Sequence, residues 1–358
     1  MHARTLVMAV LVLAVLGFNG TVSGAERATG KSRAVEVTGT VWPKPPAAAR
    51  IRFLQSADGA SDWGVARNWW GRMVDTLTGR RELPFVRPTS VVEHEGVLYV
   101  ADPGAQALVM FDAPRHKEIR VTRAGERTLV SPVAVAVGSP GTVYVADSYL
   151  RQVLQLDRDG KLLRTIGHDD LQRPSSVAFD AERQRLFVGD AKAHVVHVFD
   201  DAGHKTATLG GLGSEPGRFN SPTHLAVLPD GGIAVTDALN FRVQVFDAEG
   251  QARYCVGGHG DGAGNFAAPK GVAVDRAGHL YVADAMFDVV QIFDKDGRLL
   301  LGFGGQGNQA GQFWIPNGLD IDDEDRLFVA DAYNRRIQMF QILPATAGAD
   351  DGERGASQ

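Results

Sequence analysis

An aspartate recurs at the end of a short apolar segment six times along the chain. The segments have the form LYVAD, and their aspartates stand 43 to 47 residues apart. They are Asp102, Asp147, Asp190, Asp237, Asp284 and Asp331. A second aspartate follows ten residues later in five of the six repeats, and Gln341 takes that place in the last. A fixed period of this length indicates a small structural unit that is repeated.

Each repeat divides into four short apolar segments that are separated by turn residues. In the fifth repeat they are 271–274, 280–284, 289–294 and 298–305. Short segments joined by Gly and Asp are typical of β-hairpins, and the chain has 42 glycines. The second segment is apolar on both faces, so it must be covered on both sides. Six four-stranded antiparallel sheets packed around an axis provide that cover, which predicts an all-β, six-bladed β-propeller.

The last repeat lacks a fourth segment, because Pro344 and a polar tail follow 336–342. The stretch RIRFLQ at about 50–55 is similar to the fourth segment RLLLGF at 298–303. We therefore predict that this N-terminal strand completes the last blade, which gives a propeller domain at 50–343. Closure of this kind removes an exposed sheet edge.

The chain begins with features of a secretory signal. Residues 1–25 contain a basic start, an apolar stretch of 14 residues from Thr5 to Phe18, and small residues before Glu26. The apolar stretch is short for a membrane span, so we expect a cleaved signal peptide, with an uncleaved anchor as the alternative. We expect a secreted or periplasmic protein with no stable membrane span after cleavage. Residues 26–49 are expected to form a Pro/Ala-rich linker, and residues 344–358 a disordered tail.

One insertion interrupts the repeats at 61–80. Trp69 and Met73, and Trp70 with Val74 and Leu77, stand at helical spacing. We expect a short amphipathic helix at about 62–79, which either packs on the propeller or contacts a partner or a membrane surface.

The six recurring aspartates are expected to be structural. Each stands where the second strand turns into the third, and a carboxylate at that place accepts backbone N–H bonds. Two repeats continue with Asn240 and Arg242, or with Asn334 and Arg336. Asparagine tolerates the left-handed conformation of a tight turn, and the arginine is expected to pair with the aspartate.

The two faces of such a propeller differ in sequence. The loop face carries the turns between second and third strands and the connections between blades, which include 210–224, 257–270 and 304–317. The turn face carries the other hairpin turns and is acidic, for example at Asp322–Asp325. Large side chains stand at the tight turns of the loop face, namely Tyr149, Leu150, Phe241, Met286, Phe287 and Tyr333. Apolar tips among polar loops predict a docking surface for a protein or peptide, with packing against neighbouring repeats as the alternative.

Basic residues are expected near these tips, namely Arg87, Arg151, Arg173, Lys192 and Lys270. The contrast with the acidic turn face favours an anionic or peptide-like ligand on the loop face.

The residues just after the proline of each repeat are expected to surround the mouth of the central channel. Thr223, His224, Lys270 and Asn317 are candidate binding residues there. A catalytic zinc site usually takes three protein ligands, and only His224 occupies this ring, with His259 in a nearby loop. We therefore assign no catalytic residue, metal ligand or cofactor, and a zinc or calcium site stays an alternative.

The repeat resembles the NHL repeat. The resemblance rests on PKGVAVD at 269–275, LYVAD at 280–284 and NFRVQVFD at 240–247, and it covers about residues 80–343. It implies a six-bladed propeller that is often closed by a strand from the other terminus. Members of the family include protein-binding modules, RNA-binding domains, extracellular sensor domains and an amidating lyase that holds zinc with several histidines around the channel.

Charge and cysteine content narrow the functional classes. The net charge of −5 gives no general attraction to nucleic acid. Cys255 is the single cysteine, so neither an internal disulfide nor a CxxCH haem attachment is encoded. We expect a non-enzymatic, extracytoplasmic binding or scaffold module that recognises a protein, a peptide or another ligand. The alternative is a metal-dependent lyase or hydrolase with its site at the central channel.

Overall fold

The structure is a computed structural model of the chain, and it describes residues 39–65, 85–139 and 141–344. The expected signal peptide, most of the expected helical insertion, including Trp69 and Trp70, and the tail from residue 345 onward lie outside the described residues.

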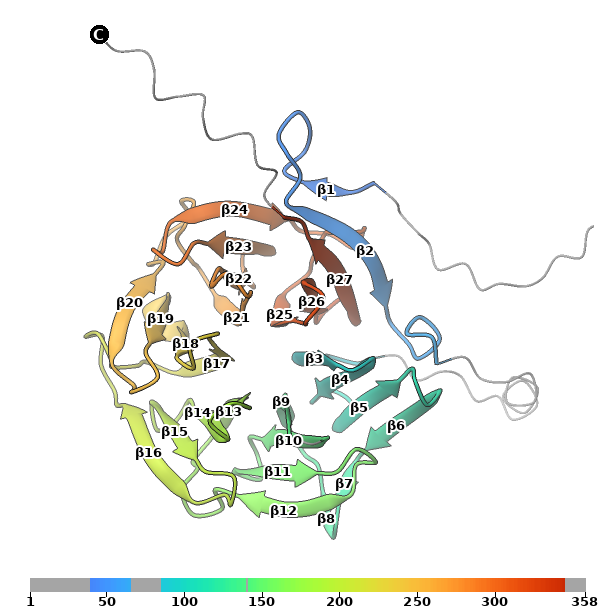
Figure 1. The fold of residues 1–358 in the computed structure, drawn as a ribbon, viewed down its shortest axis with the longest axis vertical. Coiled ribbons are helices and arrows are strands. Elements are labelled where there is room, and N and C mark those ends of the chain that lie inside the picture. The colour runs from blue at the N-terminus through green and yellow to red at the C-terminus, as the bar shows by residue number, and fades with distance from the viewer. Residues whose placement is uncertain (1–38, 66–84, 140, 345–358) are drawn as a thin grey trace, which may run out of the picture. The chain divides into compact units, whose positions relative to one another are not determined.

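Six antiparallel sheets are arranged around a central axis (Figure 1), which confirms the predicted six-bladed propeller. Blade 1 contains β3 (Ser90–His94), β4 (Val97–Asp102), β5 (Ala107–Asp112) and β6 (Lys117–Val121). A small hairpin of β7 (Arg123–Ala124) and β8 (Arg127–Thr128) follows. Blade 2 contains β9 (Pro132–Gly138), β10 (Thr142–Asp147), β11 (Gln152–Leu156) and β12 (Leu162–Ile166).

Blade 3 contains β13 (Pro174–Asp180), β14 (Arg185–Asp190), β15 (Val195–Phe199) and β16 (Lys205–Gly210). Blade 4 contains β17 (Pro222–Val227), β18 (Ile233–Asp237), the 3-10 turn η1 (Ala238–Asn240), β19 (Arg242–Phe246) and β20 (Ala252–Val256). Blade 5 contains β21 (Pro269–Val274), β22 (Leu280–Asp284), β23 (Val289–Phe293) and β24 (Leu299–Gly304). The first strand of each blade lies nearest the axis in Figure 1.

Blade 6 joins the two ends of the propeller. It contains β25 (Pro316–Ile321), β26 (Arg326–Asp331) and β27 (Arg336–Ile342), and β2 (Ile51–Ala57) pairs with β27 as the fourth strand. This pairing places Phe53 opposite Phe340 and confirms the predicted closure. Burying apolar side chains such as Ile51 and Phe53 contributes about 2 kcal/mol each.

A fifth strand extends blade 6 within the stretch that was expected to be a linker. β1 (Val41–Trp42) pairs with β2 at the outer edge. The Trp42 side chain explains why this strand is added to the blade, because its ring lies 5.4 Å from that of Phe303 and 5.9 Å from that of Phe340. Aromatic contacts of this kind stabilise by about 1 kcal/mol beyond the buried area.

A buried apolar side chain from the loop before the first strand packs into each blade. In four blades a phenylalanine of that loop packs on the phenylalanine at the end of the third strand. The pairs are Phe85–Phe111, Phe219–Phe246, Phe266–Phe293 and Phe313–Phe340, with ring centroids 5.5 to 5.9 Å apart. In blades 2 and 3 the buried Leu129 and Leu171 stand at the loop position.

The recurring aspartates are fully buried, and their carboxylates accept hydrogen bonds from the loop before the first strand. In each blade the amide just after the buried loop residue donates to the carboxylate, as Trp314 does to Asp331 at 2.8 Å and Ala267 to Asp284 at 2.7 Å. In blade 5 the tight-turn amides of Met286 and Phe287 also donate to Asp284. The aspartate therefore joins the tight turn to the connection between blades.

In blades 4 and 6, side chains replace the tight-turn amides as donors. Asn240 Nδ2 and Arg242 Nε donate to Asp237 at 2.8 and 2.9 Å, and Asn334 and Arg336 repeat this around Asp331. The left-handed residue of the turn is the one after each asparagine, Phe241 with φ 55° in blade 4. The asparagine is thereby free to bond the aspartate and a loop carbonyl, since its Nδ2 also donates to Gly213.

No helix among the residues that the structure describes is long and apolar enough to cross a bilayer.

Candidate functional site

The loop face holds most of the exposed large hydrophobic side chains. Nine such side chains are exposed among the described residues. Seven stand in tight turns or in connections between blades, namely Val86, Tyr149, Leu212, Leu239, Met286, Trp314 and Tyr333. The other two, Leu163 and Leu300, lie on the outer strands β12 and β24. The apolar groups that meet solvent are thus gathered on one face.

The tight-turn residues that were predicted from the sequence fall into two sets that differ in exposure. Tyr149, Met286 and Tyr333 are 72%, 67% and 50% exposed. Leu150, Phe241 and Phe287 are half-buried. The Phe241 ring packs against His259 at a tilt, with ring centroids 4.4 Å apart. The second set therefore supports the turns, and the first set projects from them.

Sequence reasoning missed four members of this surface, Val86, Leu212, Leu239 and Trp314. Trp314 lies against Tyr333, with ring centroids 5.5 Å apart. In the sequence Trp314 directly follows Phe313, and in the structure Phe313 is buried and the Trp314 amide donates to Asp331. A residue between a buried aromatic side chain and the first strand must point its side chain elsewhere.

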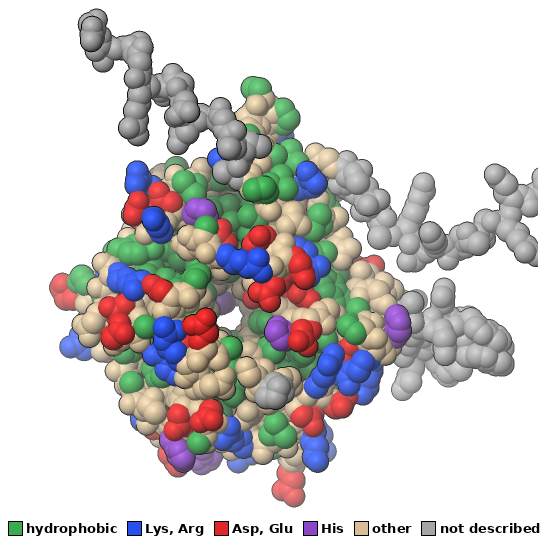
Figure 2. Space-filling model, in the orientation of Figure 1, with side chains coloured by type: hydrophobic (Ala, Val, Ile, Leu, Met, Phe, Trp, Pro, Cys, Tyr) green, Lys and Arg blue, Asp and Glu red, His purple; other side chains and the backbone are tan. Residues whose placement is uncertain are grey.

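Four basic side chains accompany the exposed apolar groups in blades 1 to 3. Arg87, Arg151, Arg173 and Lys192 are exposed on the loop face. Within the described ranges, none of them forms a salt bridge. The turn face is different, because Arg115, Arg298 and other bases there are paired with aspartates. Figure 2 shows acidic and basic side chains gathered around the central opening on one face.

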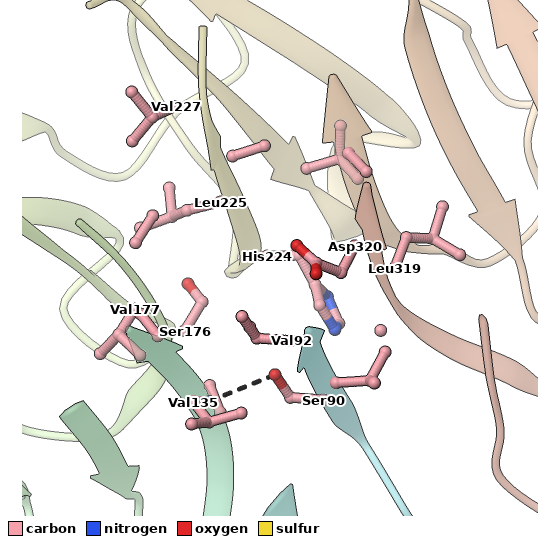
Figure 3. Close-up of a pocket in the computed structure, with 18 of the residues that line it drawn as sticks. Ser90, Val92, Val135, Ser176, Val177, His224, Leu225, Val227, Leu319 and Asp320 are labelled. Carbon is pink, nitrogen blue, oxygen red and sulfur yellow. Dashed lines mark hydrogen bonds between the residues drawn. The ribbon is translucent and has the colours of Figure 1, made fainter. Parts of the chain in front are cut away.

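The central channel holds a cavity of about 250 Å³ that is enclosed by the first strands of the blades (Figure 3). Most of its wall is apolar, from residues such as Val92, Val135 and Leu225. The polar groups on the wall include Ser90, Ser176, His224 and Asp320. Ser90 Oγ accepts the amide of Val135 at 3.2 Å. The side chains of His224 and Asp320 project into the enclosed space.

Three polar atoms at the loop-face end of the channel have no hydrogen-bond partner in the described part of the chain. They are Ser176 Oγ, Thr223 Oγ1 and His224 Nδ1. Burial lowers the pKa of His224 to about 3, and the nearby positive charge of Lys270 acts in the same direction. The imidazole is therefore neutral near pH 7. Burial also lowers the pKa of the Lys270 ammonium.

The predicted ring of channel residues is thus partly assembled. Asn317 and the Thr89 carbonyl are close enough to His224 to oppose the fall in its pKa. Gly318 donates its amide to Thr89 O at 3.0 Å across blades 6 and 1. A Cβ at Gly271 would lie 2.2 Å from Asn317 O, so glycine is needed for this close approach. These contacts bring residues of blades 1, 4, 5 and 6 together at the mouth.

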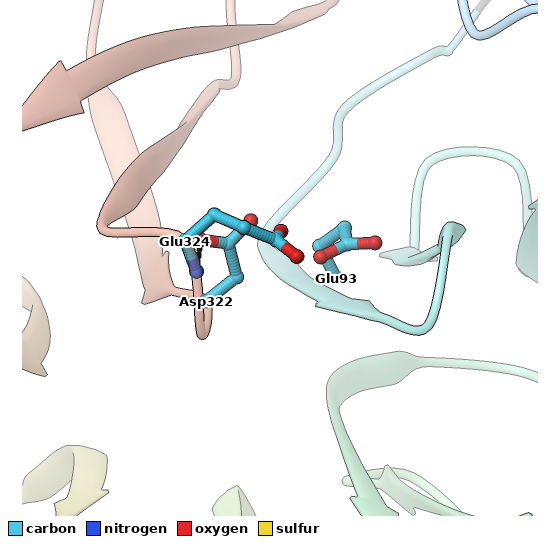
Figure 4. A group of neighbouring side chains, drawn as sticks. All are labelled: Glu93, Asp322 and Glu324. Carbon is cyan, nitrogen blue, oxygen red and sulfur yellow. Dashed lines mark hydrogen bonds between the residues drawn. The ribbon is translucent and has the colours of Figure 1, made fainter.

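An acidic group stands at the turn-face end, where blade 6 meets blade 1. The carboxylates of Glu93, Asp322 and Glu324 point toward one another (Figure 4), with candidate ligand atoms within 4.8 Å. Arg326 donates to all three, at 3.2 Å to Glu93 and 2.5 Å to Asp322 and to Glu324. A guanidinium thus already supplies the positive charge that a metal ion would bring. No group of three potential metal ligands that includes a histidine was found among the described residues.

Comparison with known proteins supports the fold. The family described as NHL repeat matches residues 219–246, which run from Phe219 to the end of β19. None of the curated proteins matches the sequence. A protein of unknown function from Bacteroides thetaiotaomicron has a similar structure, with a TM-score of 0.57 and 18% identity over 72% of this chain and 70% of that one.

Two further solved structures are similar at lower identity. Virginiamycin B lyase from Staphylococcus aureus has a TM-score of 0.54 and 12% identity, over 72% of this chain and 96% of the lyase chain. Hydrazine synthase from Kuenenia stuttgartiensis has a TM-score of 0.51 and 14% identity, over 71% of this chain and 95% of that one. Identities this low indicate a shared fold alone. The chain is a six-bladed β-propeller in which residues 219–246 match the NHL repeat.

Proposed function

We propose that the propeller is an extracytoplasmic binding module that recognises a protein or peptide on its loop face. The observation that carries the proposal is the placement of seven of the nine exposed large hydrophobic side chains on that face. Concentrated exposed apolar groups mark interaction sites on soluble proteins. NHL propellers commonly mediate protein binding, which agrees with this proposal.

The partner segment is expected to combine aromatic or aliphatic side chains with acidic ones. Tyrosine, tryptophan and methionine are common at the centres of interfaces, and Tyr149, Met286 and Trp314 supply them here. Arg151 and Lys192 are exposed on the loop face and form no salt bridge with a described residue, so they can attract acidic residues of the partner. Exposed charges of this kind raise the association rate more than they raise the affinity.

Selection of peptides from a displayed random library tests the proposal for a partner of any sequence. The affinity of a selected peptide is then measured by fluorescence anisotropy for two double variants. Tyr149→Ser with Met286→Ser is expected to weaken binding at least about tenfold. Leu163→Ser with Leu300→Ser removes two exposed side chains from the outer strands and is expected to leave the affinity unchanged. Equal loss in both variants would contradict a loop-face site.

The extracytoplasmic location rests on the expected signal at residues 1–25. Cell fractionation of the full-length protein, followed by mass spectrometry of its N-terminus, is the direct test. We expect the protein in the exported fraction, with a mature chain that begins at Glu26. A protein that stays in the cytosolic fraction with Met1 intact would remove this part of the proposal.

A further inference from the structure

The loop-face mouth of the central channel combines one cation with several polar atoms that lack partners. Lys270 is the charged residue of the ring that follows the blade prolines, and its ammonium forms no salt bridge with any described residue. Lys270 is half-buried, and a cation that is partly removed from water is stabilised by a counter-charge. Ser176 Oγ, Thr223 Oγ1 and His224 Nδ1 lie on the adjoining blades 3 and 4, and they too have no hydrogen-bond partner among the residues that the structure describes.

These groups are held in place by the fold rather than by one another. The hydroxyl of Thr236 donates to Lys270 O at 2.7 Å, and that of Ser175 donates to Pro222 O at 2.7 Å. The backbones of Lys270 and of the strand that carries Thr223 and His224 are thereby fixed. A Cβ at Gly189 would lie 2.4 Å from Ser176 Oγ, so a glycine makes room for this hydroxyl. Buried polar atoms that are placed but unsatisfied indicate a site for a bound molecule or ordered water.

We propose that this channel mouth binds a carboxylate group, with Lys270 as its counter-charge and with the hydroxyl groups of Ser176 and Thr223 as hydrogen-bond donors beside the His224 ring. Hydroxyl groups donate to a carboxylate without adding charge. A single ammonium balances a single negative charge, which favours a monoanion over a phosphate dianion.

The cavity below the mouth defines the remainder of the ligand. Its wall is mostly apolar, from Val92, Val135, Leu225 and similar residues, and also carries the carboxyl group of Asp320; it encloses about 250 Å³, which suits a short aliphatic chain. Either a free short-chain carboxylic acid or the terminal carboxylate of a peptide provides this chemistry. The site is separate from the exposed apolar side chains of the loop face, and each proposal stands without the other.

Titration of the protein with sodium butyrate at constant ionic strength tests the site, with butyramide as the uncharged control. Binding is followed by the NMR signals of the His224 ring, assigned with His224→Gln. We expect saturable shifts with butyrate, and shifts at least tenfold weaker with butyramide. Absence of saturation with butyrate up to about 100 mM, or equal binding of butyramide, would overturn the proposal and leave ordered water as the occupant.

Matched lysine variants assign the counter-charge. Lys270→Met is expected to raise the dissociation constant at least tenfold, whereas Lys192→Met, on the same face outside the channel, leaves it unchanged. Ser176→Ala keeps the charge and is expected to weaken binding severalfold, so the site stays testable if Lys270→Met fails to fold. Wild-type affinity in both channel variants would refute the assignment. A peptide with a free C-terminus, compared with its amide, separates the two sources of the carboxylate.

Discussion

The backbone amide of Glu93 in blade 1 donates a 2.8 Å hydrogen bond to Asp320 Oδ2 in blade 6. This bond crosses the junction between the first and last blades, beside the group of Glu93, Asp322 and Arg326. Burial, together with the nearby charges of Asp322 and Glu93, raises the pKa of Asp320 to about 7. Burial likewise raises the pKa of Glu93 to about 7. Both carboxyl groups therefore retain protons in the folded state at pH values where they ionise in the unfolded chain.

Asp320→Asn is expected to alter how stability depends on pH. Because the folded pKa is raised, the contribution of Asp320 to stability is fully present below about pH 4 and is lost as the pH rises to about 7. The asparagine keeps an oxygen for the Glu93 amide and does not ionise. We expect the free energy of unfolding of the variant at pH 8 to exceed that of the wild type by on the order of 2 kcal/mol.

Urea unfolding between pH 4 and pH 8 measures this difference, and Asp296→Asn on the exposed turn face is the control. Parallel pH profiles for wild type and Asp320→Asn would show that burial does not perturb this carboxyl group.

Asp284→Ala is expected to destabilise the protein by about 3–5 kcal/mol, because four partly buried backbone amides lose their fully buried acceptor. Asp284→Asn retains one acceptor oxygen and should cost less. Thermal and urea unfolding give the free energies of unfolding. Asp296→Ala, whose side chain is more than half exposed, should cost under about 1 kcal/mol. A loss for Asp284→Ala no larger than that of Asp296→Ala would show that the carboxylate does not fasten the loop.

The fold could be predicted from the sequence because the residues that indicate it recur in every repeat. Features that occur only once in the chain could not be predicted. The spacing of the aspartates from Asp102 to Asp331 indicated six blades, and RIRFLQ matched the missing strand. The loop amides that bond each aspartate stand 15 to 18 residues earlier, as Val86 and Arg87 do for Asp102 and Gln172 does for Asp190. Only the folded loop brings them together. β1 was missed because two residues carry no period, and Trp42 stabilises it through contacts with distant phenylalanines.

The candidate site was predictable at the level of faces and less so at the level of side chains. Chain topology alone assigns Tyr149 and Met286 to the loop face. Their exposure, and the partial burial of Phe241 beneath His259, depends on packing between neighbouring loops. The partnerless atoms around His224 were beyond sequence reasoning, because an unmade hydrogen bond is a property of three-dimensional neighbours.

Phe53→Ala tests the closure of the ring. Phe53 is buried and its ring lies 5.7 Å from that of Phe340 on the paired strand. The truncation is expected to cost about 3–5 kcal/mol. Hydrogen exchange should accelerate first in β2 and β27, since the loss is local to the joined strands. Arg52→Ala, exposed on the same strand, is the control and should change stability by under about 0.5 kcal/mol. Uniform acceleration in all six blades would argue that the ring has no weakened junction.

His224→Gln is expected to reduce the loss of stability in acid. Burial and the charge of Lys270 lower the folded pKa of His224 to about 3 from an ordinary value near 6.5. The unfolded chain therefore binds the extra proton between these values, and stability contributed by neutral His224 falls as the pH drops from about 6.5 toward 3. Glutamine does not titrate, so the free energy of unfolding of the variant should rise relative to that of the wild type by on the order of 2 kcal/mol on going from pH 7 to pH 4.

The measurement is made in the Asp320→Asn background, because titration of Asp320 changes the stability in the opposite direction over the same pH range. His116→Gln removes an exposed imidazole and serves as the control, and the same gain there would disprove the assignment to the channel.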